Sequence, residues 1–503
     1  MVQILPLFIV IPMGAAFVLA MLGKARHGFV DWFANIVTGL LLVLAIRLTG
    51  VREVITYAMG KWLPPLGIVL VLDGLSVFML LIVNLISFLA TIFSISYMER
   101  FTAKAKFYAM FMLMLTGLNG VILTGDIFNM FVFFEIASIA SFVLVAFGTE
   151  DEELEASFKY NVISSVTSVL LLFGIALFYG MTGTLNMAHL SQLLAGREFS
   201  PGLLFTVSLL IAGFATKAAL VPFHAWLPDA HPSAPAPVSA MLSGVFVKTL
   251  GIYVGMRILA NVIGVTNISR VWNILLVLGT ISMVAGGLLA LGQQDYKRLL
   301  AYSTISQVGY IMFAFGLGTP LGYIAALFHL ANHAIFKALM FLNSGAVEYA
   351  TETRDLSKMG GLSERMPVTG ITSTVGTLSI SGIPPFNGFW SKLLIIIAAV
   401  QAGRLTYAII AVLVSVLTLA YFLKVQRYAF FGKIKESLSH IKEVPVSMCI
   451  SLIVLAALCL VIGLDAFGIL KGINYPWFIR TIIEPAKEVL VNGTNYALTV
   501  LPK

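Results

Sequence analysis

Long apolar segments recur along nearly the whole chain and are separated by short polar connections. Most are about 20 residues long, the length that an α-helix needs to cross a bilayer. We therefore predict an all-α integral membrane protein with about 14 transmembrane helices. The predicted spans are 3–22, 30–49, 70–97, 106–123, 126–148, 157–182, 202–223, 234–262, 271–292, 299–318, 320–347, 367–402, 404–430 and 445–468. The segment 52–67 is too interrupted to span, and we expect an interfacial hairpin there.

Two of these spans are interrupted by proline in matching ways. The seventh contains Pro222 and the twelfth contains Pro384 and Pro385, with Pro222 and Pro385 163 residues apart. The same offset maps the start of span four onto the start of span nine. Because the offset covers five spans, an odd number, we predict two inverted five-helix repeats, each with a broken helix. Prolines that only kink a long helix are the alternative.

This pattern divides the chain into four parts. Residues 1–105 hold helices 1–3 and the hairpin, 106–262 the first repeat (spans 4–8), 270–430 the second repeat (spans 9–13), and 431–503 helix 14 and a C-terminal tail. Lysine and arginine are concentrated in alternate connections, such as those with Arg100, Lys358 and Lys433. That side is predicted to be cytoplasmic, which places both termini outside the cell.

Composition excludes several classes of protein. With 59% hydrophobic and 11% charged residues, no single water-soluble core could hide so much apolar surface. The net charge of +8 is spread over short connections, so no nucleic-acid partner is predicted. The only two cysteines, Cys449 and Cys459, form no CxxC motif, which argues against iron–sulfur, haem or cysteine–zinc centres in this chain. No cofactor is therefore expected.

Charged residues inside apolar spans are the candidate functional groups: Glu135, Lys217, Lys248, Lys337 and Lys392. A charge at bilayer depth costs roughly 2.5 to 3.5 kcal/mol, so it usually faces a hydrated interior and serves a function. A buried lysine releases its proton more readily, and a nearby carboxylate opposes that release. Movement of Glu135 relative to Lys217 would thus switch a proton relay toward Lys248. A static buried ion pair that only joins helices is the alternative.

Two histidines extend this set. His329, His333 and Lys337 fall at i, i+4 and i+8 on one face of span eleven, and imidazole titrates near neutrality, as a proton relay requires. Zinc binding and simple polar packing are the alternatives, but no HExxH frame accompanies the histidines and the lysine would repel a cation. No metal site is predicted. His224 and His231 flank the first break, where we expect an entry path.

Four stretches of the chain carry a family resemblance: KAALVPFHAWLPDAHPSAPAPVSAMLSG (217–244), DYKRLLAYSTISQVGY (295–310), HLANHAIFKALMFLNSG (329–345) and SGIPPFNGFWSK (381–392). They resemble the proton-conducting antiporter-like subunits of Mrp-type cation/proton antiporters, respiratory complex I and membrane-bound hydrogenases. The resemblance covers residues 70–430. It implies that Glu135 modulates Lys217, and that Lys248 leads through the histidine-bearing helix to Lys392.

The resemblance also implies partners, namely other membrane subunits of a hetero-oligomeric complex in the cell membrane. The transported ion would be H⁺, with Na⁺/H⁺ exchange left open. Lys392 and the absence of a long C-terminal lateral helix are most similar to the Mrp D-type subunit and its hydrogenase counterparts. The parent complex is either an antiporter or a redox complex of the hydrogenase type. A stand-alone organic-solute transporter is the alternative and would need a substrate pocket at the membrane midplane.

Overall fold

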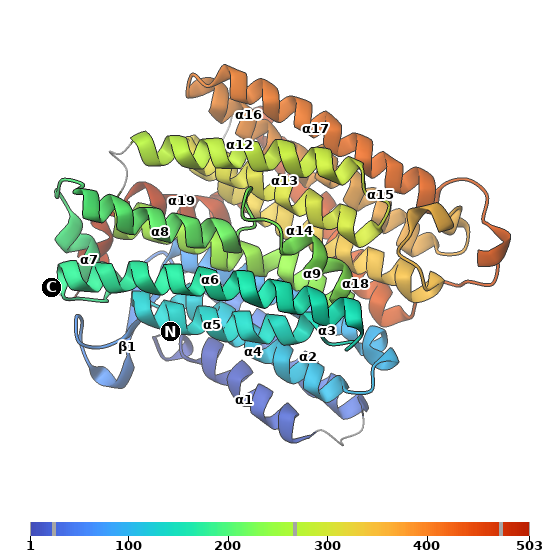
Figure 1. Ribbon diagram of the computed structural model, residues 1–503, viewed down its shortest axis with the longest axis horizontal. Helices are drawn as coiled ribbons and strands as arrows, with labels where there is room; N and C mark the ends of the chain where they lie inside the picture. The colour runs from blue at the N-terminus through green and yellow to red at the C-terminus, as the bar shows by residue number, and fades with distance from the viewer. Residues whose placement is uncertain (1, 23–26, 265–268, 472–475, 502–503) are drawn as a thin grey trace.

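The computed structural model describes residues 2–22, 27–264, 269–471 and 476–501. Its long helices run along the longest axis of the molecule (Figure 1). Within those residues, 12 helices are long and apolar enough to cross a membrane. Two shorter apolar helices, α8 (Pro201–Lys217) and α16 (Asn387–Gln401), form parts of the two predicted spans that contain proline breaks. The chain is therefore a multi-pass helical membrane protein, while the count of fourteen spans stays a prediction.

The N-terminal part contains a feature that the all-α prediction misses. Two strands pair antiparallel with Ile55 opposite Leu72, so the predicted hairpin exists as β-structure. The third span begins at Gly74 rather than at residue 70, because Asp73 caps the helix by accepting a hydrogen bond from the Ser76 backbone N–H at 2.9 Å. The elements are η1 (Val2–Ile4), α1 (Leu7–Met21), α2 (His27–Leu48), β1 (Ile55–Ala58), η2 (Met59–Lys61), β2 (Val69–Leu72), α3 (Gly74–Tyr97) and η3 (Met98–Arg100).

The next part corresponds to the first predicted repeat. Its elements are α4 (Lys104–Leu123), α5 (Ile127–Val145), α6 (Asp151–Thr182), α7 (Met187–Leu194), α8, α9 (Leu227–Ser233), α10 (Ala236–Met241), η4 (Leu242–Phe246), η5 (Lys248–Tyr253), α11 (Val254–Met256) and η6 (Arg257–Val262). The elements η4, η5 and η6 are π-helical, a geometry that is rare and often marks functional sites. The sequence pattern did not predict α7, because eight residues are too few to register as a span.

The third part corresponds to the second predicted repeat. Its elements are α12 (Ser269–Leu291), α13 (Tyr296–Gly316), α14 (Pro320–Thr351), η8 (Leu356–Lys358), η9 (Leu362–Glu364), α15 (Pro367–Ser381), α16, α17 (Leu405–Val425) and η10 (Gln426–Phe430). Every residue in the most apolar window of α14 is buried, and the same holds for the segment Ala236–Val262. These two elements form the centre of the bundle.

The two series of helices match in length and spacing. Both α6 and α14 contain 32 residues, and they run in opposite directions (Figure 1). One isolated β-bridge joins Asp126 to Asn186 and another joins Asp295 to Asp355, and both partners of the second are 169 residues after those of the first. The broken-helix prolines are only 163 residues apart, because Pro222 follows Asn186 by 36 residues whereas Pro385 follows Asp355 by 30.

The C-terminal part consists of one long helix and several short ones: η11 (Glu436–Leu438), α18 (Val446–Asp465), η12 (Ala466–Lys471), η13 (Ile479–Ile483), α19 (Glu484–Val491), η14 (Gly493–Asn495) and α20 (Tyr496–Val500). α19 packs against α3 at the end of the bundle that carries β1 and α7. We call this the hairpin end and the other the far end. None of the described helices of this tail is a long lateral helix.

Candidate functional site

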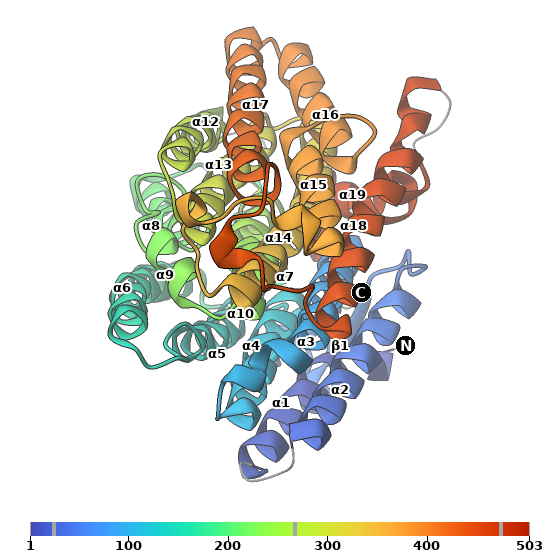
Figure 2. The ribbon, with the colours of Figure 1, turned by 90° about the vertical axis from the view of Figure 1, so that its right-hand side faces the viewer.

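The predicted relay residues lie in one row of neighbouring helices. Glu135 is on α5, Lys217 ends α8, and Lys248 begins η5, while the histidines lie on α14. The elements pack in the order α5, α6, α8, η5, η4, α14, α16 and α17, and Figure 2 shows α5 and α6 at the lower left and α17 at the top. All except Glu135, which is half-buried, are at most 2% exposed: Lys217, Lys248, His329, His333, Lys337 and Lys392.

The first cluster of the row surrounds Lys217. Its ammonium donates to the hydroxyls of Ser138, at 2.8 Å, and Ser164. Glu135 accepts a hydrogen bond from Ser168, which lies one helical turn from Ser164 on α6. Among the described residues, Glu135 and Lys217 form no ion pair. The carboxylate and the ammonium therefore communicate through two serines of the same helix.

Aromatic rings complete the surroundings of Lys217. Its ammonium lies 4.7 Å from the centroid of the Phe134 ring and 5.8 Å from that of Phe142. The face of an aromatic ring attracts a cation weakly and offers it no hydrogen-bond acceptor. Lys217 is thus held by two hydroxyl groups and two rings, without a formal counter-charge in contact.

The second cluster links Lys248 to Lys337. The Lys248 ammonium donates to the backbone carbonyl of Ser243, five residues earlier in the π-helical segment. The Ser243 hydroxyl bonds that of Thr304 on α13 at 2.8 Å, and Thr304 donates to the Leu300 carbonyl at 3.0 Å. Lys337 donates to the same carbonyl at 2.7 Å. A chain of neutral oxygen atoms therefore connects the two lysines.

The third cluster forms around His329. One ring nitrogen, Nδ1, is 2.9 Å from the hydroxyl of Ser391 on α16. The other, Nε2, is 3.2 Å from the side-chain oxygen of Gln307 on α13. His329 thus joins α13, α14 and α16, with Ser391 directly preceding Lys392 in the chain. His333 lies between the second and third clusters, and within the described part of the chain neither of its ring nitrogens has a hydrogen-bond partner.

Lys392 lies at the second broken helix. Its ammonium donates to Ser415 on α17 at 3.2 Å, and Ser415 donates to the carbonyl of Ser381, the last residue of α15. These three residues line a cavity of about 230 Å³. Its other walls include Val412 and Val416, which are exposed on the outer face of α17. The end of the row therefore opens toward the flank of the bundle.

The two histidines of the predicted entry path differ in position. His231 is fully buried, and its ring stacks on Phe341 with centroids 4.4 Å apart. The Lys337 ammonium lies 5.6 Å from the same Phe341 ring, so His231 adjoins the second cluster. His224, in the turn between α8 and α9, is only half-buried. The structure therefore brings His231, and not His224, next to the row.

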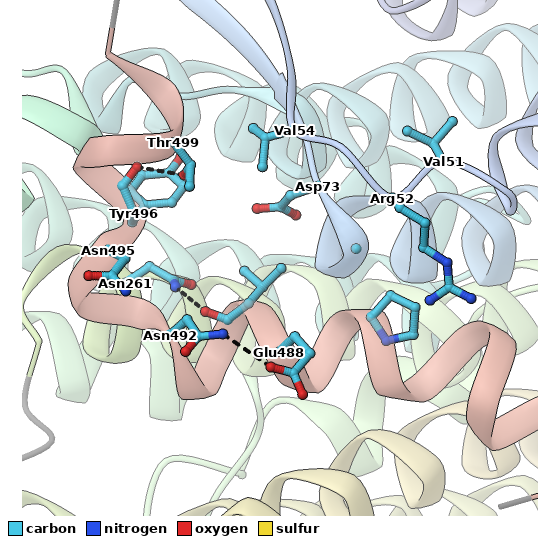
Figure 3. Close-up of a pocket in the computed structure, with 13 residues that line it drawn as sticks. Val51, Arg52, Val54, Asp73, Asn261, Glu488, Asn492, Asn495, Tyr496 and Thr499 are labelled. Atoms are coloured by element: carbon cyan, nitrogen blue, oxygen red, sulfur yellow. Dashed lines mark hydrogen bonds between the residues drawn. The ribbon is translucent and has the colours of Figure 1, made fainter. Parts of the chain in front are cut away.

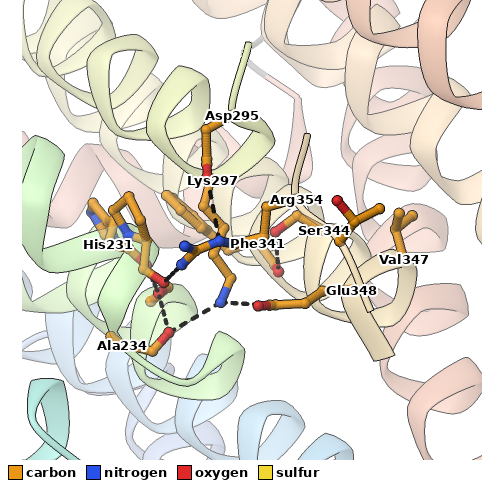
Figure 4. A network of polar contacts seen from close by, with 12 residues as sticks. His231, Ala234, Asp295, Lys297, Phe341, Ser344, Val347, Glu348 and Arg354 are labelled. Carbon is orange, nitrogen blue, oxygen red and sulfur yellow. Dashed lines mark hydrogen bonds and ion pairs between the residues drawn. The ribbon is translucent and has the colours of Figure 1, made fainter. Parts of the chain in front are cut away.

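A polar network at the far end of the bundle lies behind His231 (Figure 4). Lys297 pairs with Glu348 at 2.7 Å and donates to the Ala234 carbonyl at 3.1 Å. Arg354 donates to the Pro232 carbonyl. Two cations of the second repeat therefore hold two carbonyls at the end of α9, that of Pro232 in its last turn and that of Ala234 directly after it. Lys297, Glu348 and Arg354 also line a polar cavity of about 510 Å³.

The charges of this network change the pKa of two of its members that lie outside the membrane-spanning helices, Asp295 and Arg354. Burial raises the pKa of the Asp295 carboxyl despite the neighbouring Arg354. Burial would lower the pKa of Arg354, but the carboxylates of Asp295, Glu348 and Glu152 outweigh it and raise that pKa. Arg354 pairs with Glu152 on α6 and with Asp295, both at 3.3 Å. The guanidinium therefore stays charged and ties the two repeats together.

A second buried ion pair lies at the hairpin end, and the sequence pattern did not reveal it. Arg257 binds both carboxylate oxygens of Asp73, at 2.6 and 2.8 Å. Burial raises the pKa of Asp73, but Arg257 outweighs that effect and lowers it. Asp73 also lines a cavity of about 260 Å³ beneath the C-terminal tail, beside Tyr496 and Glu488 (Figure 3). Asp73 is also the residue that caps α3.

Several partners of the row were also missing from the sequence-based set. Ser164 and Ser168 are spaced i, i+4 on α6, and a search for small polar residues at helical spacing inside apolar spans would have found them. Lys297 was not singled out, although it is 2% exposed. Within the described part of the chain, no group of three or more histidine, cysteine or carboxylate side chains is placed to hold a metal ion.

Comparison with known proteins identifies relatives along the whole chain. The family model for the transmembrane region of NADH:quinone oxidoreductase and Mrp antiporter subunits matches residues 124–418. The model for the N-terminus of complex I chain 5 matches residues 64–108. The D-type subunit of the Na⁺/H⁺ antiporter of Alkalihalophilus pseudofirmus is 34% identical over 92% of this chain and 94% of its own length.

Two solved structures have the same fold. A chain of the Mrp complex from Dietzia sp. matches with a TM-score of 0.91 and 29% identity, over 100% of this chain and 99% of that one. A chain of the membrane-bound sulfane sulfur reductase, an archaeal respiratory membrane complex, matches with a TM-score of 0.87 and 33% identity, over 99% and 100%. The chain therefore belongs to the family of antiporter-like membrane subunits found in NADH:quinone oxidoreductases and Mrp antiporters.

Proposed function

We propose that this chain is an ion-translocating subunit of a multi-subunit membrane complex in the cell membrane and that it moves protons through the buried row from Glu135 to Lys392. The observation that carries the proposal is the row itself. Six buried basic side chains follow one another across neighbouring helices, accompanied by one half-buried carboxylate. Such residues are expensive to keep inside a membrane bundle, and proton relays are a common reason for them.

The first step of the relay uses the cluster at Lys217. While Ser168 holds Glu135 and Ser164 holds Lys217, the carboxylate favours a charged lysine from a short distance. When Glu135 moves away or becomes protonated, the charged lysine loses that support in a site of low dielectric constant. Lys217 then releases its proton toward the next group in the row, Lys248.

The transfer from Lys217 to Lys248 requires water. In the described residues no hydrogen bond links the two side chains, although their helices touch. A Cβ atom on Gly251 of η5 would lie 2.5 Å from backbone atoms of Ala218, which directly follows Lys217. Buried polar groups without protein partners, such as both ring nitrogens of His333, are the usual sites of internal water. Such water would join the three clusters into one path.

The row also needs an entrance and an exit. The polar cavity at the far end, with Lys297 at its floor and His231 behind it, is suited to proton entry. His224 was expected on the same path and remains a weaker candidate. Lys392, beside the break at Pro384 and Pro385, is suited to be the last group, because its cavity opens between α16 and α17.

The matched helices support the division into two inverted repeats, residues 106–262 and 270–430, between the N-terminal residues 1–105 and the C-terminal residues 431–503. By the positive-inside rule the far end, which carries Lys358 and Lys433, would face the cytoplasm. Both termini would then lie on the outer side. We propose no cofactor or metal ion for this chain itself.

The parent complex is either a Mrp-type antiporter or a redox-driven complex. The Alkalihalophilus pseudofirmus relative is named a Na⁺/H⁺ antiporter subunit, and the archaeal neighbour belongs to a sulfane sulfur reductase. Proteins that co-purify with this chain would decide between them, because iron–sulfur subunits would accompany only a redox complex. The stand-alone organic-solute transporter predicted as an alternative is not favoured by any observation.

Transport by the intact complex in sealed vesicles tests this proposal. Wild-type vesicles should build or dissipate a proton gradient, and Lys217→Ala should reduce the rate by about 100-fold, the usual scale for losing a proton-transfer group. Lys424→Ala is the matched control, because Lys424, near the end of α17, binds only the backbone carbonyls of Leu291 and Gln293 at the end of α12. A wild-type rate in Lys217→Ala, with the complex assembled, would overturn the assignment.

A further inference from the structure

Trp226 closes the first broken helix over Lys217. It is 1% exposed, and its indole N–H donates to the backbone carbonyl of Thr216 at 2.9 Å. Its ring lies nearly parallel to the Tyr160 ring on α6, with centroids 4.3 Å apart and an angle of 9°. Thr216 directly precedes Lys217, so Trp226 binds the backbone of the residue next to the lysine.

The stack extends to the walls of the Lys217 site. The Tyr160 hydroxyl bonds that of Ser141 on α5 at 3.0 Å. Phe142 meets the Tyr160 ring edge-on, with centroids 4.6 Å apart, and the same Phe142 ring lies 5.8 Å from the Lys217 ammonium. Trp226, Tyr160 and Phe142 therefore connect α9, α6 and α5 around the end of α8.

The Thr216 carbonyl has two acceptor positions, and both are occupied. One accepts the backbone N–H of Ala219 at 3.0 Å, in the turn that ends α8, and the other accepts the indole of Trp226. A carbonyl with a free acceptor position in a low-dielectric site would attract a nearby ammonium or a water molecule. Trp226 removes that competitor, which leaves the serine hydroxyls as the partners of Lys217.

We propose that Trp226 is a positioning residue for Lys217: it fixes the end of α8 and occupies the Thr216 carbonyl, so that the ammonium faces Ser138 and Ser164. This inference rests on the proposed proton-translocating function. It concerns a neutral aromatic side chain that neither takes up nor releases a proton and does not belong to the row of ionisable groups.

Lys217 has a single electrostatic partner among the titratable groups of the helices around it, which makes a pH profile informative. These groups are Glu135 on α5, Lys248 and Tyr253 on η5, and on α6 Tyr160, Tyr179 and, in its first three turns, Asp151, Glu152, Glu153, Glu155 and Lys159. Of these, only Glu135 acts electrostatically on Lys217. If the Thr216 carbonyl gained a free acceptor position, it would accept a hydrogen bond from the Lys217 ammonium. That hydrogen bond would stabilise the protonated form of Lys217.

The test uses Trp226→Phe in the intact complex, which keeps an aromatic ring but removes the N–H donor. We expect a several-fold lower transport rate and a pH profile displaced to higher pH by about 0.5 to 1 unit, the shift that one hydrogen bond produces. The matched control is Trp390→Phe. Trp390 is equally buried, but its indole N–H has no hydrogen-bond partner among the residues that the structure describes, so this change should leave the pH profile in place.

The results separate this inference from the proposed function. If Lys217→Ala abolishes transport but Trp226→Phe has the pH profile of Trp390→Phe, the positioning role is wrong and the relay stands. If Lys217→Ala transports normally, the proposed function itself fails. Should Trp226→Phe not assemble, Tyr160→Leu removes the stacking partner instead. It should displace the profile in the same direction, and an unchanged profile would overturn the inference.

Discussion

Glu135 and Lys217 are connected by one turn of α6 instead of by direct contact. Ser168 donates to the carboxylate, and Ser164, four residues earlier, accepts from the ammonium. The Ser168 hydroxyl is also 3.0 Å from the Ser164 carbonyl, so both ends of the link are anchored to the same backbone. A small change in the packing of α5 against α6 therefore changes how strongly the carboxylate supports the charge on the lysine.

Removal of either serine should weaken this link. In Ser168→Ala the Glu135 carboxylate loses its hydrogen bond, and in Ser164→Ala the lysine loses one of its two acceptors. We expect each to lower the transport rate about tenfold, because a hydrogen bond to a charged group is worth roughly 1.5 to 3 kcal/mol. Initial rates of gradient formation in vesicles measure this. Ser165→Ala, an exposed change between the two sites, should transport like the wild type.

Thr304 is the expected weak point between Lys248 and Lys337. Its hydroxyl bonds Ser243 and donates to Leu300, the carbonyl that accepts from Lys337. Thr304→Val keeps the shape of the side chain but removes this hydroxyl, so transport should fall about tenfold or more. Thr304→Ser keeps the hydroxyl and should restore most of the rate. Equal rates in the two variants would remove Thr304 from the path.

The helix positions followed from hydropathy, because the bilayer dictates the length of each apolar segment. A hairpin was predicted before the third span, but its second strand was not, since the buried strand Val69–Leu72 reads as the start of the following span. The lysines of the row were visible as charges among apolar residues. Ser164 and Ser168 were not, because a serine in an apolar helix is common and its role depends on which helix packs beside it. Arg257 also lies inside a predicted span, 234–262, but was not among the candidate functional residues predicted from the sequence.

Asp73 and Arg257 should contribute to stability more than to transport. Asp73→Asn leaves a buried guanidinium without its counter-charge, which typically costs about 3 to 5 kcal/mol. Thermal unfolding of the purified complex in detergent would show this as a lower Tm. Asp31→Asn, which breaks the separate ion pair with Lys104, is a comparison of similar burial. A lower Tm in Asp31→Asn but not in Asp73→Asn would contradict the expectation.

The same pair predicts a pH dependence of stability. Arg257 holds the pKa of Asp73 below its ordinary value of 3.8. A carboxylate with a lowered pKa stabilises the fold above its ordinary pKa, and this contribution is lost as the pH falls through the lowered value. The contribution should thus be complete at neutral pH and should diminish only below about pH 4. A Tm difference between wild type and Asp73→Asn that already vanishes at pH 6 would contradict this assignment.

The central claim is that the buried side chains form one continuous path across the bundle. The most direct measurement is proton flux through the intact complex in sealed vesicles with Lys248→Ala and with Lys392→Ala, compared under one imposed gradient. Because these residues lie in different clusters of the same row, we predict that each variant loses flux about tenfold or more while the complex stays assembled. A wild-type flux in either variant would show that protons cross the protein by another route.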